Sequence, residues 1–485
     1  MARSHDFPHF CASKFAARLS SPPMTAHASR NMALIIAATG FGFALVQLDV
    51  TIVNVALPRM GSELSASVSA LQWVVNAYAV AFSVCLLTAG SIGDRVGAKK
   101  IYLAGFALFT AASLGCGLSR DIQFLILSRA IQGVGAALML PNSLTLLNHV
   151  CSHDAKLRAR SVGQWTAVGG FTIAAGPLVG GLLLHIGSWR NIFFVNVPLA
   201  IVGVALTLKV LEETEKPKHP GRTDWAGQIF SVLALTALNY AFIEARPLGL
   251  LHPWVIGSAL TAVLSAAAFI WSENRASAPM LPLTFFKLPG FSPAVIYGVC
   301  VNLAYYGVVF VLSLYLQEQL HYSPLRAGLA YIPLTATFII SNVVSGALTS
   351  HRGSRLPMTL GAVIAAVGFV ALAAVREHTS YYYLLLPFVL LPLGIGLGVP
   401  AMTTCLLSLV DKRASGVAAG VLNAARQAGG AIGVAVFGAI ASAFPKNLAD
   451  GVRWDAITAT VMMLVIAVLA RATVKSHPSK TGGPG

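Results

Sequence analysis

The sequence predicts an all-α, polytopic membrane protein with 14 transmembrane helices. Of its 485 residues, 56% are hydrophobic and only 10% are charged, whereas soluble domains carry about 25% charged residues. Apolar runs long enough to cross about 30 Å of hydrocarbon as helices recur along nearly the whole chain. A water-soluble globule cannot bury that much apolar surface, so we expect the lipid bilayer to surround the protein.

Charged residues and Pro- or Gly-rich breaks divide the apolar runs into individual spans. A crossing helix needs about 20 residues, and every span reaches about that length. Glu244, Arg246 and Glu273 crowd the ends of the seventh and eighth spans. The predicted spans are 32–57, 71–92, 99–118, 122–148, 161–186, 190–211, 224–244, 252–271, 291–317, 325–349, 356–375, 381–409, 414–443 and 453–472.

The positions of Lys and Arg predict which side of the membrane each loop faces, because cytoplasmic loops are enriched in them. With the N-terminus in the cytoplasm, 23 of the 33 basic residues lie in inner segments and 8 in outer loops. The other two, Arg129 and Arg426, lie inside spans. We therefore expect both termini in the cytoplasm. The net charge of +16 is interpreted as an orientation signal, with no nucleic-acid partner.

The two chain ends are predicted to be cytoplasmic tails, residues 1–31 and 474–485. The first tail is basic and lacks the apolar core of a secretory signal, and Met24 is an alternative start. The six cysteines show no paired spacing of a disulfide framework. The tryptophans fall near predicted span ends, where amphipathic rings settle at the headgroups.

An internal repeat predicts two similar halves. GSIGDRVGAKKIYLAGFALF, starting at Gly90, matches GALTSHRGSRLPMTLGAVIA, starting at Gly346. The resulting organisation is a six-helix bundle over 32–211, linkers with two inserted helices over 212–290, and a second six-helix bundle over 291–473. Transporters are commonly built from such repeats, with the binding site near the bilayer midplane between the halves.

Four motifs then occur in order along the chain. They are LDVTIVNVALP (48–58), GSIGDRVGAKK (90–100), SRAIQGVGAALMLP (128–141), and GGFTIAAGPLVGG (169–181) followed by WRNIFFVNVP (189–198). In these motifs the chain resembles the major facilitator superfamily, and within it the 14-helix drug:proton antiporter family of EmrB/QacA type. The resemblance implies the major facilitator fold and proton-driven export of small amphipathic compounds across the inner (plasma) membrane. It implies no cofactor and no enzymatic activity.

Asp49 is interpreted as the proton-coupling residue. It lies in a nearly all-aliphatic stretch, LVQLDVTIVNVALP, and a charge at bilayer depth costs at least about 2.5–3.5 kcal/mol on insertion scales. Burial favours the protonated carboxylic acid and a nearby cation favours the ionised form, so a carboxylate held between the two can take up and release a proton. The alternative is a purely structural contact of the first helix.

The two basic residues inside spans are Arg129 and Arg426. A guanidinium does not deprotonate in proteins, so Arg129 cannot carry the proton but can hold a carboxylate ionised. The resemblance likewise implicates Arg129 in proton transfer, whereas the alternative is a snorkelling or carbonyl-capping arginine. Contact between Asp49 and Arg129 is left open. Arg426, in NAARQAGG, either faces the cavity or bonds to Gln427.

Two motifs are predicted to take part in conformational change. In the loop GDRVGAKK, glycines permit a tight turn and Asp94 is a candidate latch against a cation or a helix N-terminus. Small residues in the fifth span allow close helix approach, and proline bends a helix. The resemblance identifies this glycine-rich segment as the antiporter motif. The candidate gating residues are Asp94, Arg95, Gly97, Gly176, Pro177, Gly180 and Gly181.

Substrate contacts are expected from polar or aromatic groups inside spans of both halves. They are Asn54, Asn76, Trp165, Tyr305, Asn342, Asn423 and Arg426. Some cation exporters of the resembled family carry a second membrane acid in a later span. No acid lies well inside the last six predicted spans, so the sequence does not predict a preference for lipophilic cations.

A metal site and other functions are alternatives to this interpretation. His149, Cys151 and His153 form HVCSH in a predicted cytoplasmic loop, but with no third ligand nearby no metal site is predicted. A proton-coupled importer, or an exporter of one specific metabolite, is the same-fold alternative. A non-transporting sensor or scaffold is the alternative from another class, and a periplasmic adaptor is left open.

Overall fold

The computed structural model describes residues 26–151, 155–214, 224–276, 279–410, 415–444 and 447–474. Both predicted tails, 1–31 and 474–485, fall almost wholly outside this part, and so does His153. The elements in it are α2 (Ala26–Glu63), α3 (Val68–Val96), α4 (Ala98–Leu118), α5 (Ile122–Val150), α6 (Ala155–Ile186), α7 (Asn191–Phe194), α8 (Asn196–Val210), α9 (Trp225–Leu248), α10 (Pro253–Arg275), η1 (Leu283–Lys287), α11 (Phe291–Leu314), η2 (Tyr315–Gln319), α12 (Pro324–Ala330), α13 (Ile332–Arg352), α14 (Arg355–Leu372), α15 (Tyr381–Ser408), α16 (Ser415–Ser442) and α17 (Leu448–Thr473).

The described residues contain 14 segments long and apolar enough to cross a membrane, which confirms the predicted all-α membrane fold. Several helices run past the predicted span ends. Asp94 and Arg246, for example, lie on helices past the predicted span ends and are exposed, because a helix can continue beyond the hydrocarbon into a region where charged side chains are solvated. The tenth span is divided into α12 and α13 at Tyr331, and the sixth into α7 and α8 at Val195.

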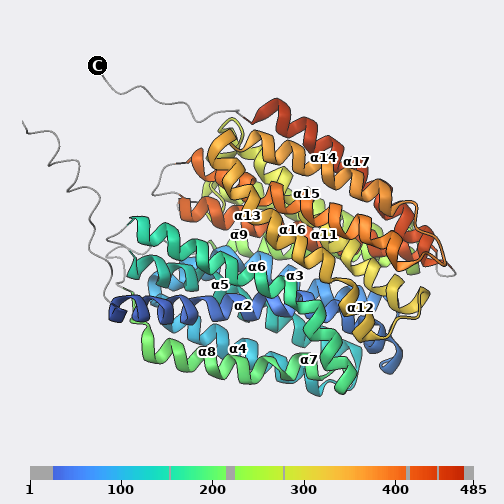
Figure 1. Ribbon diagram of the computed structural model, residues 1–485, viewed down its shortest axis with the longest axis horizontal. Coiled ribbons are helices and arrows are strands. Elements are labelled where there is room, and N and C mark those ends of the chain that lie inside the picture. The colour runs from blue at the N-terminus through green and yellow to red at the C-terminus, as the bar shows by residue number, and fades with distance from the viewer. Residues whose placement is uncertain are drawn as a thin grey trace, which may run out of the picture.

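The helices form two groups that pack side by side. In Figure 1, α2 to α8 lie in one layer of the bundle and α11 to α17 in the other. The first residues of α2 and the last residues of α17 lie at the same end of the bundle (Figure 1), called the terminal end below; the opposite end is the distal end. This arrangement agrees with an even number of crossings.

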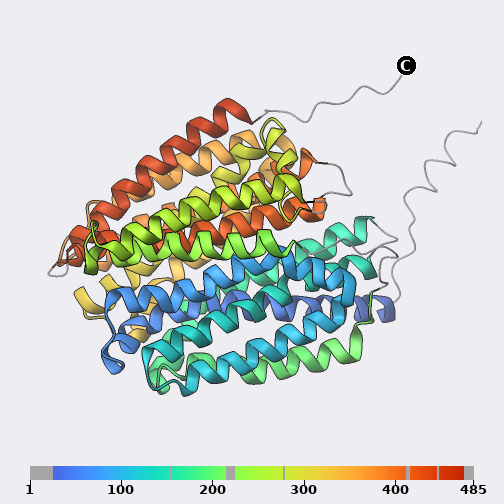
Figure 2. The same ribbon diagram turned by 180° about the vertical axis from the view of Figure 1, so that it is seen from behind.

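The inserted helices α9 and α10 lie along the seam between the two groups (Figure 2). α9 packs against α3 of the first group and α16 of the second, and α10 packs against α9. Three polar contacts join α9 to α3 in the described part of the chain: Trp73 Nε1 donates to Glu244 Oε1 at 3.3 Å, Thr88 bonds to Gln228, and Gln228 Nε2 donates to Cys85 Sγ at 3.9 Å. Among the described residues no side-chain hydrogen bond is present between α9 and α16.

Hydrogen bonds and close backbone packing hold the two groups together towards the distal end. Gln72 Nε2 of α3 donates to the carbonyls of Val434 and Ala435, each at 2.9 Å. Gln317 Nε2 donates to the Val55 carbonyl at 2.9 Å. Because each bond crosses between the groups, the structure has its distal ends closed.

Candidate functional site

Asp49 and Arg129 form a buried ion pair inside the first helix group. Asp49 lies near the middle of α2 and Arg129 in the second turn of α5, and their exposed fractions are 0% and 1%. Arg129 Nη1 lies 2.5 Å from Asp49 Oδ2. The contact left open by the sequence is therefore made. A buried charge is tolerated when it is paired and hydrogen-bonded, and the pair meets that requirement.

Further donors surround the Asp49 carboxylate. Gln132 Nε2 donates to Asp49 Oδ1 at 2.9 Å, and Asn196 Nδ2 donates to the same oxygen at 3.1 Å. Both amides also reach Ser113 Oγ, at 2.7 and 3.2 Å. Asp49 thus accepts hydrogen bonds from three side chains on α5 and α8. Both oxygens of the buried carboxylate are therefore hydrogen-bonded, as buried polar groups require.

The guanidinium of Arg129 is held on all sides. Its Nη1 also donates to Gln132 Oε1 at 2.5 Å, and its Nε donates to the Val74 carbonyl at 3.1 Å. The Tyr78 ring lies 4.3 Å from its central carbon and the Phe193 ring 5.8 Å. An arginine engaged through its fork and its faces loses several contacts at once when it moves, so this arrangement defines one discrete position.

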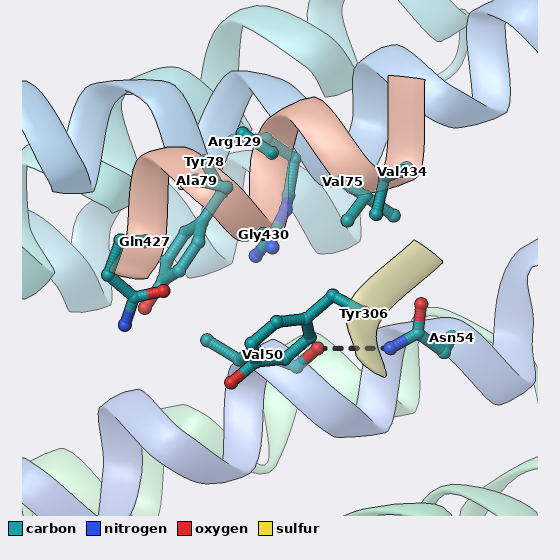
Figure 3. A pocket seen from close by; sticks show the side chains of 11 residues that line it. Val50, Asn54, Val75, Tyr78, Ala79, Arg129, Tyr306, Gln427, Gly430 and Val434 are labelled. Atoms are coloured by element: carbon teal, nitrogen blue, oxygen red, sulfur yellow. Dashed lines mark hydrogen bonds between the residues drawn. The ribbon is translucent and has the colours of Figure 1, made fainter. Parts of the chain in front are cut away.

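A narrow cavity lies where the two helix groups meet, beside this ion pair (Figure 3). Arg129 forms part of the cavity wall, whereas Asp49 does not. The carboxylate therefore sits behind the guanidinium as seen from the cavity. The wall consists of Val50, Asn54, Val75, Tyr78, Ala79, Arg129, Tyr306, Gln427, Gly430, Ala431 and Val434.

Of the predicted substrate contacts, Asn54 lines this cavity directly. Trp165 instead stacks on Phe43, with ring centroids 4.0 Å apart, and donates to the Thr39 carbonyl at 3.3 Å. Tyr305 packs edge-on against Tyr306, which does line the cavity.

The remaining predicted contacts lie away from the wall. Asn342 donates to the Phe338 carbonyl at 2.7 Å. Asn76 is fully buried, and neither its amide nitrogen nor its oxygen has a partner in the described part of the chain. Asn423 is half-buried on α16. Their proposed contact with substrate remains a prediction.

Arg426 lies next to the cavity wall on α16. Gln427 and Gly430, its neighbours in the next residue and the next turn, both line the cavity. No hydrogen bond from Arg426 to Gln427 is present within the described residues, and Arg426 Nε is buried there without a partner. The hydrogen bond to Gln427 that the sequence allowed is thus not made.

The loop between α3 and α4 differs from the expected arrangement in one respect. The N-terminus of α4 is capped by Glu213, whose carboxylate accepts from the backbone N–H groups of Lys99 at 2.9 Å and Lys100 at 3.2 Å. Asp94 is exposed and has no partner among the described residues. Gly97 has a φ of 116°, which only glycine adopts readily. The latch role of Asp94 and the roles of Arg95 and Gly97 stay predictions.

The glycines of the fifth span permit two close helix contacts. A Cβ on Gly176 would overlap Thr51 of α2, and one on Gly180 would lie 3.0 Å from Ile52. A Cβ on Gly181 would lie 2.8 Å from the Pro324 carbonyl oxygen of α12. Adjacent faces of α6 thus pack within its own group and across the junction between the groups.

The same junction contains a second glycine. A Cβ on Gly328 of α12 would overlap the carbonyl oxygen of Pro177. Gly181 and Gly328 therefore bring the backbones of α6 and α12 together, as small residues do at membrane helix interfaces.

The expectation that no acid lies well inside the last six spans is wrong. Asp455 is on α17 with an exposed fraction of 1%, and neither of its carboxyl oxygens has a partner within the described residues. The predicted span began at residue 453, but the helix begins at Leu448. The earlier start places Asp455 about two turns into the helix rather than at its end.

Sequence reasoning missed most partners of the ion pair and most of the cavity wall. Gln132 is one turn after Arg129 in SRAIQGVGAALMLP, and Asn196 belongs to WRNIFFVNVP. Both residues therefore lie in two of the four motifs on which the family resemblance rests. Ser113, Tyr78 and Tyr306 carried no comparable signal, because their role depends on helix rotation and on packing between distant segments.

The helix arrangement, the two groups and the buried charge pair beside a central cavity define a membrane transporter fold. Residues 39–434 match the Major Facilitator Superfamily model. The chain therefore belongs to the major facilitator superfamily. It also has the fold of a D-xylose-proton symporter of known structure, with a TM-score of 0.67 and 14% identity over 91% of this chain and 98% of the other.

Several relatives in this family are named for drug resistance. A methylenomycin A resistance protein of Bacillus subtilis (strain 168) is 35% identical over 84% of this chain and 87% of its own. The multidrug resistance protein Stp of Mycobacterium tuberculosis (H37Rv) is 34% identical over 86% and 77%. A tetracenomycin C resistance and export protein of Streptomyces glaucescens is 32% identical over 85% and 77%.

Proposed function

We propose that the protein is a proton-coupled multidrug exporter that moves small amphipathic compounds out of the cell by alternating access. The observation that carries the proposal is the Asp49–Arg129 pair, in which Arg129 contacts both the coupling carboxylate and the cavity. A carboxylate at this depth, paired with an arginine that lines a site between two helix groups, is the arrangement expected of a proton-coupled carrier.

The relatives support export over import. One is named for resistance to methylenomycin A, another for multidrug resistance, and a third for resistance to and export of tetracenomycin C. Resistance by a membrane carrier requires that the compound leaves the cytoplasm. We extend that direction of transport to this chain.

In the proposed cycle, Arg129 holds Asp49 ionised while the distal ends are closed. Substrate entering the cavity competes for the guanidinium, and the rocking of the two helix groups then opens the distal end. Asp49, released from Arg129, takes a proton from the outer side as the substrate leaves. Return to the first arrangement restores the ion pair and delivers the proton to the cytoplasm. Arg129 remains charged throughout.

The proposed orientation places the terminal end in the cytoplasm of a cell whose inner or only membrane holds the protein. The excess of Lys and Arg in the segments assigned to that side supports it. We also propose that residues 32–211 and 291–473 act as the two moving bodies, with 212–290 connecting them.

The test is dye uptake into everted membrane vesicles under an imposed pH gradient, with wild type and Asp49→Asn compared. Proton-driven accumulation of an amphipathic dye by wild type, and its loss in Asp49→Asn with binding retained, would support the proposal. Accumulation by the variant at the wild-type rate would remove Asp49 from the coupling. Loss of dye from energised wild-type vesicles would indicate import.

A further inference from the structure

We propose that the central cavity binds the anionic group of its substrate through Arg426, so that the exported compounds are small amphipathic anions such as aromatic carboxylates. This inference rests on the proposed export function and specifies its substrate class. It follows from a comparison of the two arginines inside the spans, of which Arg129 has a counterion and Arg426 has none among the described residues.

Arg129 and Arg426 differ sharply in their partners. Arg129 has a carboxylate, an amide and a backbone carbonyl bound to it. Arg426 forms no ion pair within the described residues, and its Nε is buried without a hydrogen-bond acceptor. An unpaired charge inside a protein in the bilayer is costly, so a protein that retains one there gains most from a ligand of opposite charge.

The position of Arg426 directs it to the cavity. Its aliphatic stem packs on α11, since a Cβ on Gly298 would lie 3.1 Å from Arg426 Cγ. Gly430, one turn further along α16, lines the cavity and contacts Tyr306. Residues four apart share a helix face. Arg426 therefore lies at the margin of the cavity nearer the terminal end, and its side chain is half-buried.

The acids near the cavity are already occupied or lie elsewhere. Asp49 neutralises Arg129. Glu244, on α9, accepts a hydrogen bond from Trp73 of α3. Asp455 is on α17, which packs on α11, α14 and α16 within the second group. Among the described residues, the cavity region therefore carries one uncompensated positive charge, that of Arg426.

The rest of the wall fits an amphipathic anion. A guanidinium binds a carboxylate through two parallel hydrogen bonds, and the Gln427 amide and Tyr306 hydroxyl are further donors at the same wall (Figure 3). Val50, Val75 and Val434 provide apolar surface for the body of the compound. On the proposed orientation, a substrate coming from the cytoplasm meets Arg426 before it reaches Arg129.

The experiment uses two xanthene dyes of similar shape and opposite charge, fluorescein and rhodamine 123, on purified protein in lipid nanodiscs. Binding is measured by fluorescence anisotropy for wild type, Arg426→Gln, Arg426→Lys and Arg453→Gln. The last variant removes the same charge from an exposed arginine on α17. Wild type should prefer fluorescein. Arg426→Gln should weaken fluorescein binding about 10- to 100-fold, the loss of a charged hydrogen bond, without weakening rhodamine 123.

The two other variants test whether the planar guanidinium and its position are required. Arg426→Lys should bind fluorescein with an affinity between those of wild type and Arg426→Gln, because it keeps the charge but loses the planar fork. Arg453→Gln should behave as wild type. A second measurement needs no variant: 1-naphthoate should displace fluorescein from wild type, and the uncharged 1-naphthamide should not.

Several outcomes would overturn the inference. They are fluorescein binding unchanged in Arg426→Gln, equal displacement by naphthoate and naphthamide, preference for rhodamine 123, or binding of neither dye. The proposed export function is judged separately. If everted vesicles accumulate rhodamine 123 in a manner that needs Asp49, proton-driven export stands and only the anionic substrate class fails.

Discussion

Arg129 separates Asp49 from the cavity: its Nη1 lies 2.5 Å from Asp49 Oδ2, and the same side chain forms part of the cavity wall. A compound in the cavity therefore meets the guanidinium first. In the proposed mechanism, a group that binds Arg129 there competes with the carboxylate, so that occupancy of the cavity affects Asp49 without direct contact between them.

Removing one member of the Asp49–Arg129 pair should lower the free energy of unfolding more than removing both members. Arg129→Gln leaves a buried carboxylate without its cation, which costs about 3–5 kcal/mol, and the variant should melt well below wild type in detergent. Adding Asp49→Asn should recover part of that loss. Thermal melting of the two single variants and the double variant measures the coupling. Strictly additive losses would mean that the two side chains do not depend on each other.

Gln132 should matter for coupling as well as for stability. Gln132→Leu removes a donor to Asp49 and an acceptor for Arg129, and each group left unsatisfied costs about 1–3 kcal/mol. Asn142→Leu is the matched control on the same helix, because within the described residues Asn142 bonds to two backbone carbonyls, those of Ala89 and Leu138, and to neither member of the ion pair. Both variants should melt earlier, but only Gln132→Leu should lose pH-driven transport. Equal pH-driven transport by the two variants would show that Gln132 has no role in proton coupling.

A side chain at Gly181 should hold the distal ends apart. In Gly181→Val the new Cβ meets the Pro324 backbone, which cannot move aside as a flexible side chain can. Gly170→Val on the same helix is the control, since nothing lies within 4 Å of a Cβ there.

The readout is labelling of Val434→Cys by an impermeant maleimide added from the outer side, in a protein whose native cysteines have been replaced. Labelling should be faster in Gly181→Val than in wild type, and unchanged in Gly170→Val. Equal rates in all three proteins would show that the α6–α12 contact does not control access to the cavity.

Substitutions of Asp94 and Glu213 should have different effects: the first should slow transport and the second should lower stability. Asp94 is exposed and has no partner in the described part of the chain, so Asp94→Ala should melt as wild type while slowing transport if Asp94 acts as a latch in another conformation. Glu213→Ala removes the cap of α4 and should cost about 1 kcal/mol. Wild-type turnover in Asp94→Ala would reject the latch.

Much of the fold and the centre of the site could be predicted from sequence, because a bilayer requires long apolar segments and makes a charged residue within such a segment unusual. Lipid requires long apolar helices, so the spans are visible as apolar runs. The same requirement singles out Asp49 and Arg129 as charges that need partners. Asp455 escaped because it stands near a span end, where the sequence alone does not locate the start of the helix.

The cavity wall could not be predicted in the same way. Tyr78 and Tyr306 come from different halves, and nothing local in the sequence indicates that their rings meet the same space. Trp165 and Tyr305, which are chemically similar, face their own helix groups instead. Which aromatic residue reaches the cavity depends on the rotation of each helix about its axis, and that rotation is set by tertiary packing.

The inserted helices introduce an asymmetry into the motion. α9 is hydrogen-bonded to α3 near both of its ends, through Trp73 and Glu244 and through Thr88 and Gln228, but it meets α16 without such bonds in the described part of the chain. In the proposed rocking motion, α3 and α16 move apart, and we expect α9 to move with α3 and to shift along α16. The inserted pair would then cover one side of the opening seam against lipid throughout the motion.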